Sequence, residues 1–95
     1  MAQSTILALG YLAASSSDVV VAAGASVNIG AFTSSGTIPA DLQLSVMIDS
    51  PGADVLIGLI TPANRVVSVN GPGTFRVLRP LIDATVPVGV FLESA

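Results

Sequence analysis

Hydrophobic and polar residues alternate along much of this 95-residue chain with the period of two that is typical of β-strands. The pattern is clearest at Leu42, Leu44, Val46 and Ile48, where the residues in between point to the opposite face. Shorter runs with the same period occur at Val27 and Ile29, at Val55, Ile57 and Leu59, at Val67 and Val69, at Phe75 and Val77, and at Val88, Val90 and Leu92. Each run predicts a strand with one buried face.

Two apolar stretches lack this alternation. Residues 19–21 are three consecutive valines, which predicts a short strand buried on both sides. Residues 6–14 are followed by three serines and superficially resemble a secretion signal, but no basic residue occurs before Arg65. We therefore expect residues 6–14 to form the first strand.

Turn-forming residues separate the predicted strands. Residues 49–54 and 70–73 combine Asp or Asn with Pro and Gly, and both segments are expected to be reverse turns, the second one a hairpin. Breaks are also expected at residues 23–24 and 36–39. Pro39 and Asp41 could start a helix, but the alternation that follows favours a strand.

The spacing of these signals predicts the fold class. Strands separated by turns about every 8–12 residues indicate an all-β protein, an antiparallel β-sandwich or small barrel of about seven or eight strands with little or no helix. Residues 1–95 are expected to form a single domain, because a chain of this length has room for one core.

The residue types that are missing argue against catalysis. The chain has no histidine, cysteine, lysine or tryptophan, and so lacks the usual general base, thiolate nucleophile and nitrogen or sulfur metal ligands. Without a base to activate them, the serines at 15–17 are expected to shape a turn. Asp49 and Asp54 are two acids in a turn, too few for a calcium loop. We expect no catalytic residue, no metal site and no cofactor.

Charge is scarce, and this bears on partners. Only 9% of residues are charged, and the net charge is −3. The three arginines are too few to form a surface that binds nucleic acid. No run of about 20 apolar residues predicts a membrane span. So few charges favour a surface that is covered by copies of the chain or by another protein, although a monomer coated with Ser, Thr and Asn is the alternative.

Arg76 and Arg79 are the most informative charges. In a strand over residues 74–78, Arg76 lies on the face opposite Phe75, whereas Arg79 has the parity of Phe75 at the strand end. Either arginine can pair with Asp49, Asp54 or Asp83, or anchor a protein interface. The candidate interface residues are Arg76, Arg79 and Phe91.

Residues 15–27, residues 71–80 and residues 88–91 together resemble small structural proteins of tailed bacteriophage particles. In that family a Gly-Thr-aromatic-Arg-x-x-Arg strand commonly precedes a final Val-Gly-Val-Phe strand. The resemblance implies a virion component without catalytic residues, such as a capsid decoration (cement) protein that binds the major capsid protein and stabilises the head. It also implies synthesis in the host cytoplasm and a final location in the virion.

Two other functions remain open. One is a tail or head-to-tail accessory, which belongs to the same structural class and differs in copy number. The other, less favoured, is a carbohydrate-binding module, since such sites use aromatic platforms and the only aromatic residues are Tyr11, Phe32, Phe75 and Phe91.

Overall fold

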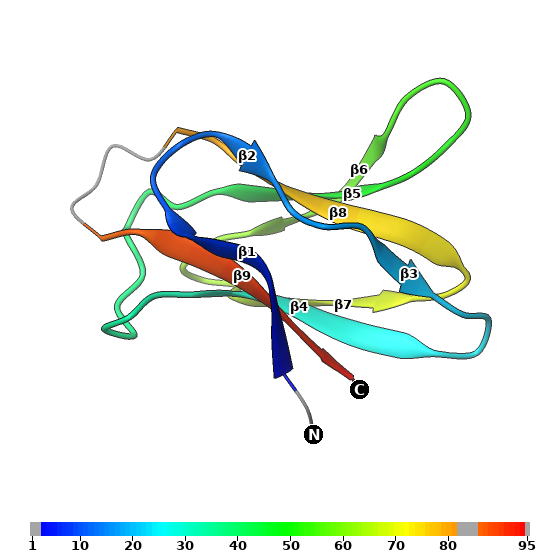
Figure 1. Cartoon of the computed structure of the whole chain (residues 1–95), viewed down its shortest axis with the longest axis horizontal. Coiled ribbons are helices and arrows are strands. Elements are labelled where there is room, and N and C mark those ends of the chain that lie inside the picture. The colour runs from blue at the N-terminus through cyan, green and yellow to red at the C-terminus, as the bar shows by residue number, and fades with distance from the viewer. Residues whose placement is uncertain (1–2, 82–85, 95) are drawn as a thin grey trace.

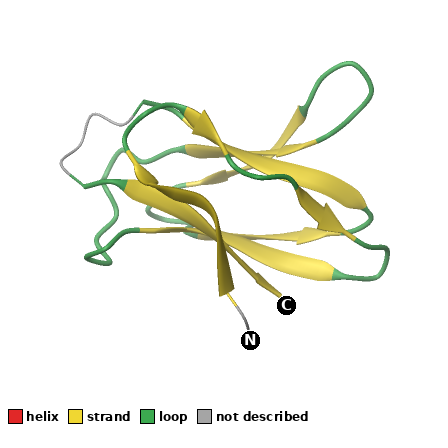
Figure 2. Cartoon of the chain, in the orientation of Figure 1, coloured by secondary structure: helices red, strands yellow, loops and turns green. Residues whose placement is uncertain are grey.

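The computed structural model describes residues 3–81 and 86–94, which contain nine strands and no helix (Figures 1 and 2). The strands are β1 (Gln3–Gly10), β2 (Ala14–Ser15), β3 (Val19–Val21), β4 (Ser26–Phe32), β5 (Leu44–Ile48), β6 (Val55–Ile60), β7 (Val66–Asn70), β8 (Gly73–Arg79) and β9 (Val88–Ser94). Within these ranges, no helix is therefore present that is long and apolar enough to cross a membrane.

The strands form two antiparallel sheets that pack face to face, so the predicted all-β sandwich is confirmed (Figure 1). Sheet A has the order β1-β9-β4-β7. Sheet B has the order β2-β8-β5-β6, and β3 pairs with the same strand, β8, that β2 pairs with. The strand count exceeds the expected seven or eight because β2 and β3 are short pieces that share one neighbour.

The core contains the apolar residues that the alternation placed on one face. Phe75 and Val77 of β8 are buried, as are Val88 and Val90 of β9 and Ile29 of β4. These side chains come from both sheets and form a single hydrophobic cluster. The period of two therefore predicted the inward face of β4, β8 and β9 correctly.

The expectation that residues 19–21 are buried on both sides is wrong. Val19 and Val21 are buried, but the side chain of Val20 is 79% exposed. The strand therefore has one inward face, which packs on the core, and one face toward solvent, and it pairs only with β8. Three apolar residues in a row do not show which of these faces is covered.

The expected face of β6 is also wrong, because the strand contains a β-bulge. Val46 pairs with Gly58 and the next residue of β5 pairs with Leu56, which leaves Ile57 as the extra residue. The bulge shifts the inward position from Leu59 to Ile60, which is fully buried, whereas Leu59 is only partly buried. A simple count by twos cannot follow the chain through such a bulge.

Residues 70–73 are not a hairpin, because β7 belongs to sheet A and β8 to sheet B. The segment crosses from one sheet to the other and passes so close to the neighbouring loop that a Cβ on Gly71 would lie 2.0 Å from the Ala22 carbonyl oxygen. Only glycine fits at that crossing. The chain does reverse at residues 49–54, as expected, and there the connection is a hairpin, since it joins the paired strands β5 and β6.

The boundaries of two predicted strands shift. The first strand, β1, covers Gln3–Gly10 instead of residues 6–14, and Ala14 begins the separate strand β2. Leu42 is buried, but its backbone N–H donates to the Pro39 carbonyl at 3.1 Å in a turn, so β5 begins only at Leu44. The helix considered at this position does not form.

Candidate functional site

Arg79 is buried at the end of β8, with 7% of the residue exposed. Its side chain has the predicted inward parity, and its guanidinium donates hydrogen bonds to three backbone carbonyls. They are those of Leu12 at 2.8 Å, Ala8 at 2.8 Å and Val88 at 2.7 Å. Arg79 makes no ion pair with a described acidic residue, and Asp83, one of its predicted partners, lies outside the described residues.

The guanidinium of Arg79 connects three segments that are remote in sequence. It joins the end of β1, the loop that follows β1, and the first residue of β9. A Cβ on Gly10 would lie 2.8 Å from Nη2 of Arg79, so the glycine leaves room for the charged group. Since three of its N–H donors bind carbonyls within the domain and the residue is buried, Arg79 organises the fold and offers little to a partner.

Arg76 lies on the outward face of sheet B and pairs with two acids. Its Nη1 is 2.6 Å from Oδ2 of Asp54, and its Nε is 3.1 Å from Oδ1 of Asp18. The hydrogen bond with Asp54, and then the one with Asp18, raises the pKa of the Arg76 guanidinium, which therefore stays charged far above neutral pH. The predicted pairing with Asp54 is confirmed, and the side chain of Arg76 remains 25% exposed.

Asp18 reaches Arg76 because of the break between β2 and β3. In this break, the buried side chain of Ser16 accepts a hydrogen bond from the backbone N–H of Val77 at 2.9 Å, while Ser16 N–H donates to the Val77 carbonyl at 2.8 Å. These bonds keep the chain against β8 where regular pairing stops. Val19 then pairs with Phe75, so the preceding Asp18 lies next to Arg76.

The outward face of sheet B is largely apolar around Arg76. Its residues form two rows across β6, β5 and β8, namely Leu56, Met47 and Arg76 in one row and Leu59, Ser45 and Leu78 in the other. Residues that alternate with them along β5 and β8 are fully buried, which fixes this face as the outward one. We call Met47, Leu56, Leu59 and Leu78 the apolar face.

Exposed apolar residues continue from the apolar face onto the edge strand β6. Val55, Leu56 and Ile57 are all exposed, with 52% of Leu56 accessible to solvent. No residue from Val55 to Ile60 is charged or proline, so β6 lacks the gatekeeper residues that usually protect an edge, and the bulge at Ile57 is its one protective feature. Leu56 belongs to both this edge and the apolar face, so the two adjoin each other.

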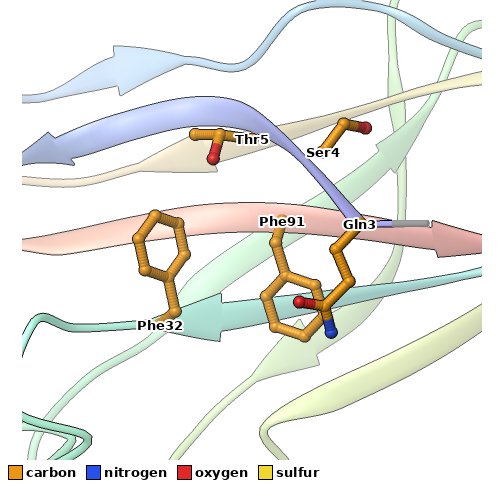
Figure 3. A pocket seen from close by; sticks show the side chains of 5 residues that line it. All are labelled: Gln3, Ser4, Thr5, Phe32 and Phe91. Atoms are coloured by element: carbon orange, nitrogen blue, oxygen red, sulfur yellow. The ribbon is translucent and has the colours of Figure 1, made fainter. Parts of the chain in front are cut away.

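Phe91, the third predicted interface residue, lies on the opposite side of the molecule, on the outward face of sheet A. It forms an edge-to-face pair with Phe32, with ring centroids 6.4 Å apart and the ring planes at 65°. The two rings and the side chains of Gln3, Ser4 and Thr5 line a hollow of about 340 Å³ (Figure 3). Phe91 therefore does not share a surface with Arg76.

Each of the two rings lies opposite a glycine on the neighbouring strand of sheet A. Phe91 pairs across the strands with Gly30, and Phe32 pairs with Gly89. A Cβ on Gly30 would lie 2.6 Å from Cε1 of Phe91, and one on Gly89 would lie 2.7 Å from Cε1 of Phe32. Each ring therefore lies against the backbone of the neighbouring strand.

Acidic residues do not gather into a metal site in the part of the chain that the structure describes, where no three carboxylates cluster. Asp54 is instead held by Arg76, while the backbone N–H of Asp49 donates to the Thr74 carbonyl at 2.9 Å. The described surface thus has two candidate binding features. One is the apolar face, beside which Asp54 and Asp18 hold Arg76. The other is the hollow lined by Phe32 and Phe91.

Comparison with known proteins gives no assignment, because no protein-family model, curated protein or solved structure matches this chain. The resemblance to phage structural proteins therefore stays a prediction.

Sequence reasoning placed Arg76 on the face opposite Phe75 and offered Asp54 as one of three possible partners, but it missed Asp18 and the association of Phe32 with Phe91. Both depend on strand register, which the alternation alone does not give. The signal that was available for the aromatic pair is the placement of glycines at positions 30 and 89, in predicted strands that would otherwise carry side chains.

Proposed function

We propose that this protein is a non-enzymatic structural protein of a virion, a capsid decoration protein that binds the major capsid protein through the apolar face and the β6 edge. The observation that carries the proposal is the exposure of Val55, Leu56 and Ile57 on an edge strand without charge. Edge strands of this kind pair readily with other chains, and a stable partner removes the hazard of aggregation.

The apolar face supports a protein partner. The outward face of an antiparallel sheet in water is normally polar, which is the case for Asn28 and Ser68 on sheet A but not for Leu56, Leu59 and Leu78 on sheet B. Large apolar patches on a folded domain mark interaction surfaces. With charged residues making up only 9% of the chain, this surface has few charges to keep it in solution alone.

Arg76 supports the same surface as an anchor. Arginine is over-represented among residues that dominate the energy of interfaces, and a side chain held in one conformation loses little entropy on binding. Asp54 and Asp18 hold the guanidinium in place, and a quarter of the side chain remains accessible. Arg76 is therefore the interface candidate that the geometry favours, ahead of the buried Arg79.

The resemblance of residues 71–80 and 88–91 to phage structural proteins narrows the partner to a virion protein. On this basis we place the protein in the virion after synthesis in the host cytoplasm, and we expect it to form a homo-oligomer there. Symmetric docking of many copies turns a modest interface into a firm hold on a shell. The lack of histidine, cysteine and lysine supports a function without catalysis.

Binding to particles tests this proposal directly. Purified protein is mixed with phage particles that lack it, and cosedimentation and the heat resistance of the particles are measured. We expect binding and increased resistance for the wild type, loss of both for Leu56→Lys, and no change for Val66→Lys, a control with a similarly exposed apolar residue on sheet A. Wild-type protein that neither sediments with the particles nor protects them contradicts the proposal.

The number of copies on each particle separates decoration from the tail alternative. A decoration protein is present in numbers on the order of hundreds, whereas a ring at the tail or at the head-to-tail junction uses only a few copies. Quantitative mass spectrometry of purified particles gives this number. A low copy number with intact binding favours the tail or head-to-tail accessory.

A further inference from the structure

We propose that the hollow formed by Phe32 and Phe91 on sheet A binds a neutral sugar ring. The proposal starts from the contrast between these rings and their surroundings. Several other outward residues of sheet A are polar and pair with one another: Gln3 Nε2 donates to Glu93 Oε2 at 3.1 Å, and Ser68 Oγ donates to Asn28 Oδ1 at 2.6 Å. Two of the three phenylalanines in the chain lie on this face, together with the exposed Val66 beside Gly30.

The glycines opposite the rings are required for space and not for backbone conformation. Gly30 and Gly89 do not adopt positive φ, so any residue could take their backbone geometry. A Cβ at either position would come within 2.7 Å of an aromatic carbon. The two glycine–phenylalanine pairs therefore hold both rings down on the sheet, with their outer surfaces facing the hollow.

The angle between the rings gives the hollow a floor and a wall. With their planes at 65° and their centroids 6.4 Å apart, Phe32 and Phe91 present aromatic surface on two sides of a bound group. Aromatic rings carry a partial negative charge on their faces, which attracts C–H groups that carry a partial positive charge. The C–H face of a pyranose ring is a ligand of this kind.

The remaining lining residues match the hydroxyl groups of a sugar. Gln3 contributes an amide and Thr5 a hydroxyl, so donors and acceptors for hydrogen bonds lie beside the rings, whereas the Ser4 hydroxyl points away from them (Figure 3). A purely apolar ligand would leave these groups desolvated without partners. A volume of about 340 Å³ lies at the small end of the range for ligand pockets and suits a mono- or disaccharide unit.

The charges near the hollow exclude an anionic ligand. No arginine lines it: Arg76 lies on sheet B, the guanidinium of Arg79 is held by carbonyls, and Arg65 donates to the Gly36 carbonyl at 3.4 Å. The charged group beside the hollow is the carboxylate of Glu93, which accepts from Gln3. A phosphorylated or acidic sugar would be repelled, so the proposed ligand is uncharged.

Binding is tested with a panel of neutral trisaccharides, namely maltotriose, cellotriose, laminaritriose, N,N′,N″-triacetylchitotriose and mannotriose. Each is titrated to about 10 mM into the ¹⁵N-labelled full chain while amide resonances are followed by NMR. We expect at least one saccharide to shift the resonances of Thr5, Gly30 and Gly89 in a saturable manner. If no member of the panel shifts them at this concentration, the proposal is overturned.

Variants show whether binding depends on stacking against the aromatic face of Phe91 or only on an apolar side chain at that position. Phe91→Leu keeps an apolar side chain over Gly30 but removes the aromatic face, and it is expected to weaken binding about threefold to tenfold. Thr5→Val removes one hydroxyl at constant shape and is expected to weaken binding as well. Leu78→Ala, on sheet B, is the control and should bind like the wild type. If Phe91→Leu and Thr5→Val both bind saccharide with the affinity of the wild type, the proposal is contradicted. The NMR spectrum of each variant shows whether it is folded.

Because the hollow and the apolar face lie on opposite sheets, the two proposals fail independently. A domain that binds particles but no saccharide retains the proposed structural function, and the reverse result retains the sugar site.

Discussion

The most constrained single residue is Arg79, whose charge is buried and hydrogen-bonded to carbonyls of three separate segments. A planar guanidinium carries five donors in a fixed arrangement, which allows this one side chain to bind three carbonyls that approach from different directions. The parity of Arg79 was predictable from Phe75 and Val77, but its partners were not, because they come from β1, its loop and β9.

Replacing Arg79 with methionine should therefore be costly. Arg79→Met retains the long apolar stem but removes the donors that bind the carbonyls of Ala8, Leu12 and Val88, the last of them in a buried bond, and we expect it to lower the free energy of unfolding by about 3 kcal/mol. Urea denaturation followed by circular dichroism measures the change. The control is Arg65→Ala, at an exposed residue, which should change stability by less than about 0.5 kcal/mol. Equal effects of the two substitutions would show that the hydrogen bonds of Arg79 add nothing.

A second residue-scale prediction concerns the glycines under the aromatic rings. Gly30→Ala forces Phe91 off the backbone and should destabilise the domain by about 1–3 kcal/mol. Gly58→Ala is the matched strand control, because its Cβ would meet Val67 Cγ1 at an ordinary 3.6 Å, and there we expect no loss of stability. Thermal or urea unfolding compares the two variants, and a harmless Gly30→Ala would mean that the ring moves aside freely.

At the scale of elements, the sequence predicted where most strands lie but not which sheet each belongs to. The alternation in β4, β8 and β9 matched the inward faces, since each of these strands lies between neighbours in its sheet and does not form an edge. It failed in β6, where the bulge at Ile57 breaks the period, and in β3, which is an edge strand. The segment 70–73 has the composition of a hairpin turn, yet it crosses between sheets, because turn residues specify a change of direction and not a partner.

The break between β2 and β3 gives a prediction at this scale. The Ser16 hydroxyl accepts from the Val77 N–H, which would otherwise be buried without an acceptor, so Ser16→Ala should cost about 1–2 kcal/mol. The neighbouring Ser17 is exposed, and Ser17→Ala should leave stability unchanged. Amide hydrogen exchange at Val77 offers a direct second measurement: it should become faster in Ser16→Ala only. Unchanged exchange would argue against this role of the hydroxyl.

At the scale of the whole molecule, the two sheets present different outer surfaces. The outer face of sheet A combines polar pairs with the aromatic hollow and Val66, whereas sheet B carries the apolar face and a β6 edge without charge. Composition predicted that the chain has too few charges to cover its surface, but it could not say where the uncovered part lies. The answer depends on the bulge in β6, which turns both Leu56 and Leu59 outward, and on the register that puts Leu78 beside them.

The central claim is that the apolar face and the β6 edge form a protein contact surface, and self-association of the purified chain tests it most directly. Sedimentation equilibrium is measured from about 10 µM to about 1 mM for the wild type, Leu56→Lys and the control Val66→Lys. We predict that the wild type and Val66→Lys associate with increasing concentration and that Leu56→Lys stays monomeric. A wild-type chain that remains an ideal monomer over the whole range would contradict the account.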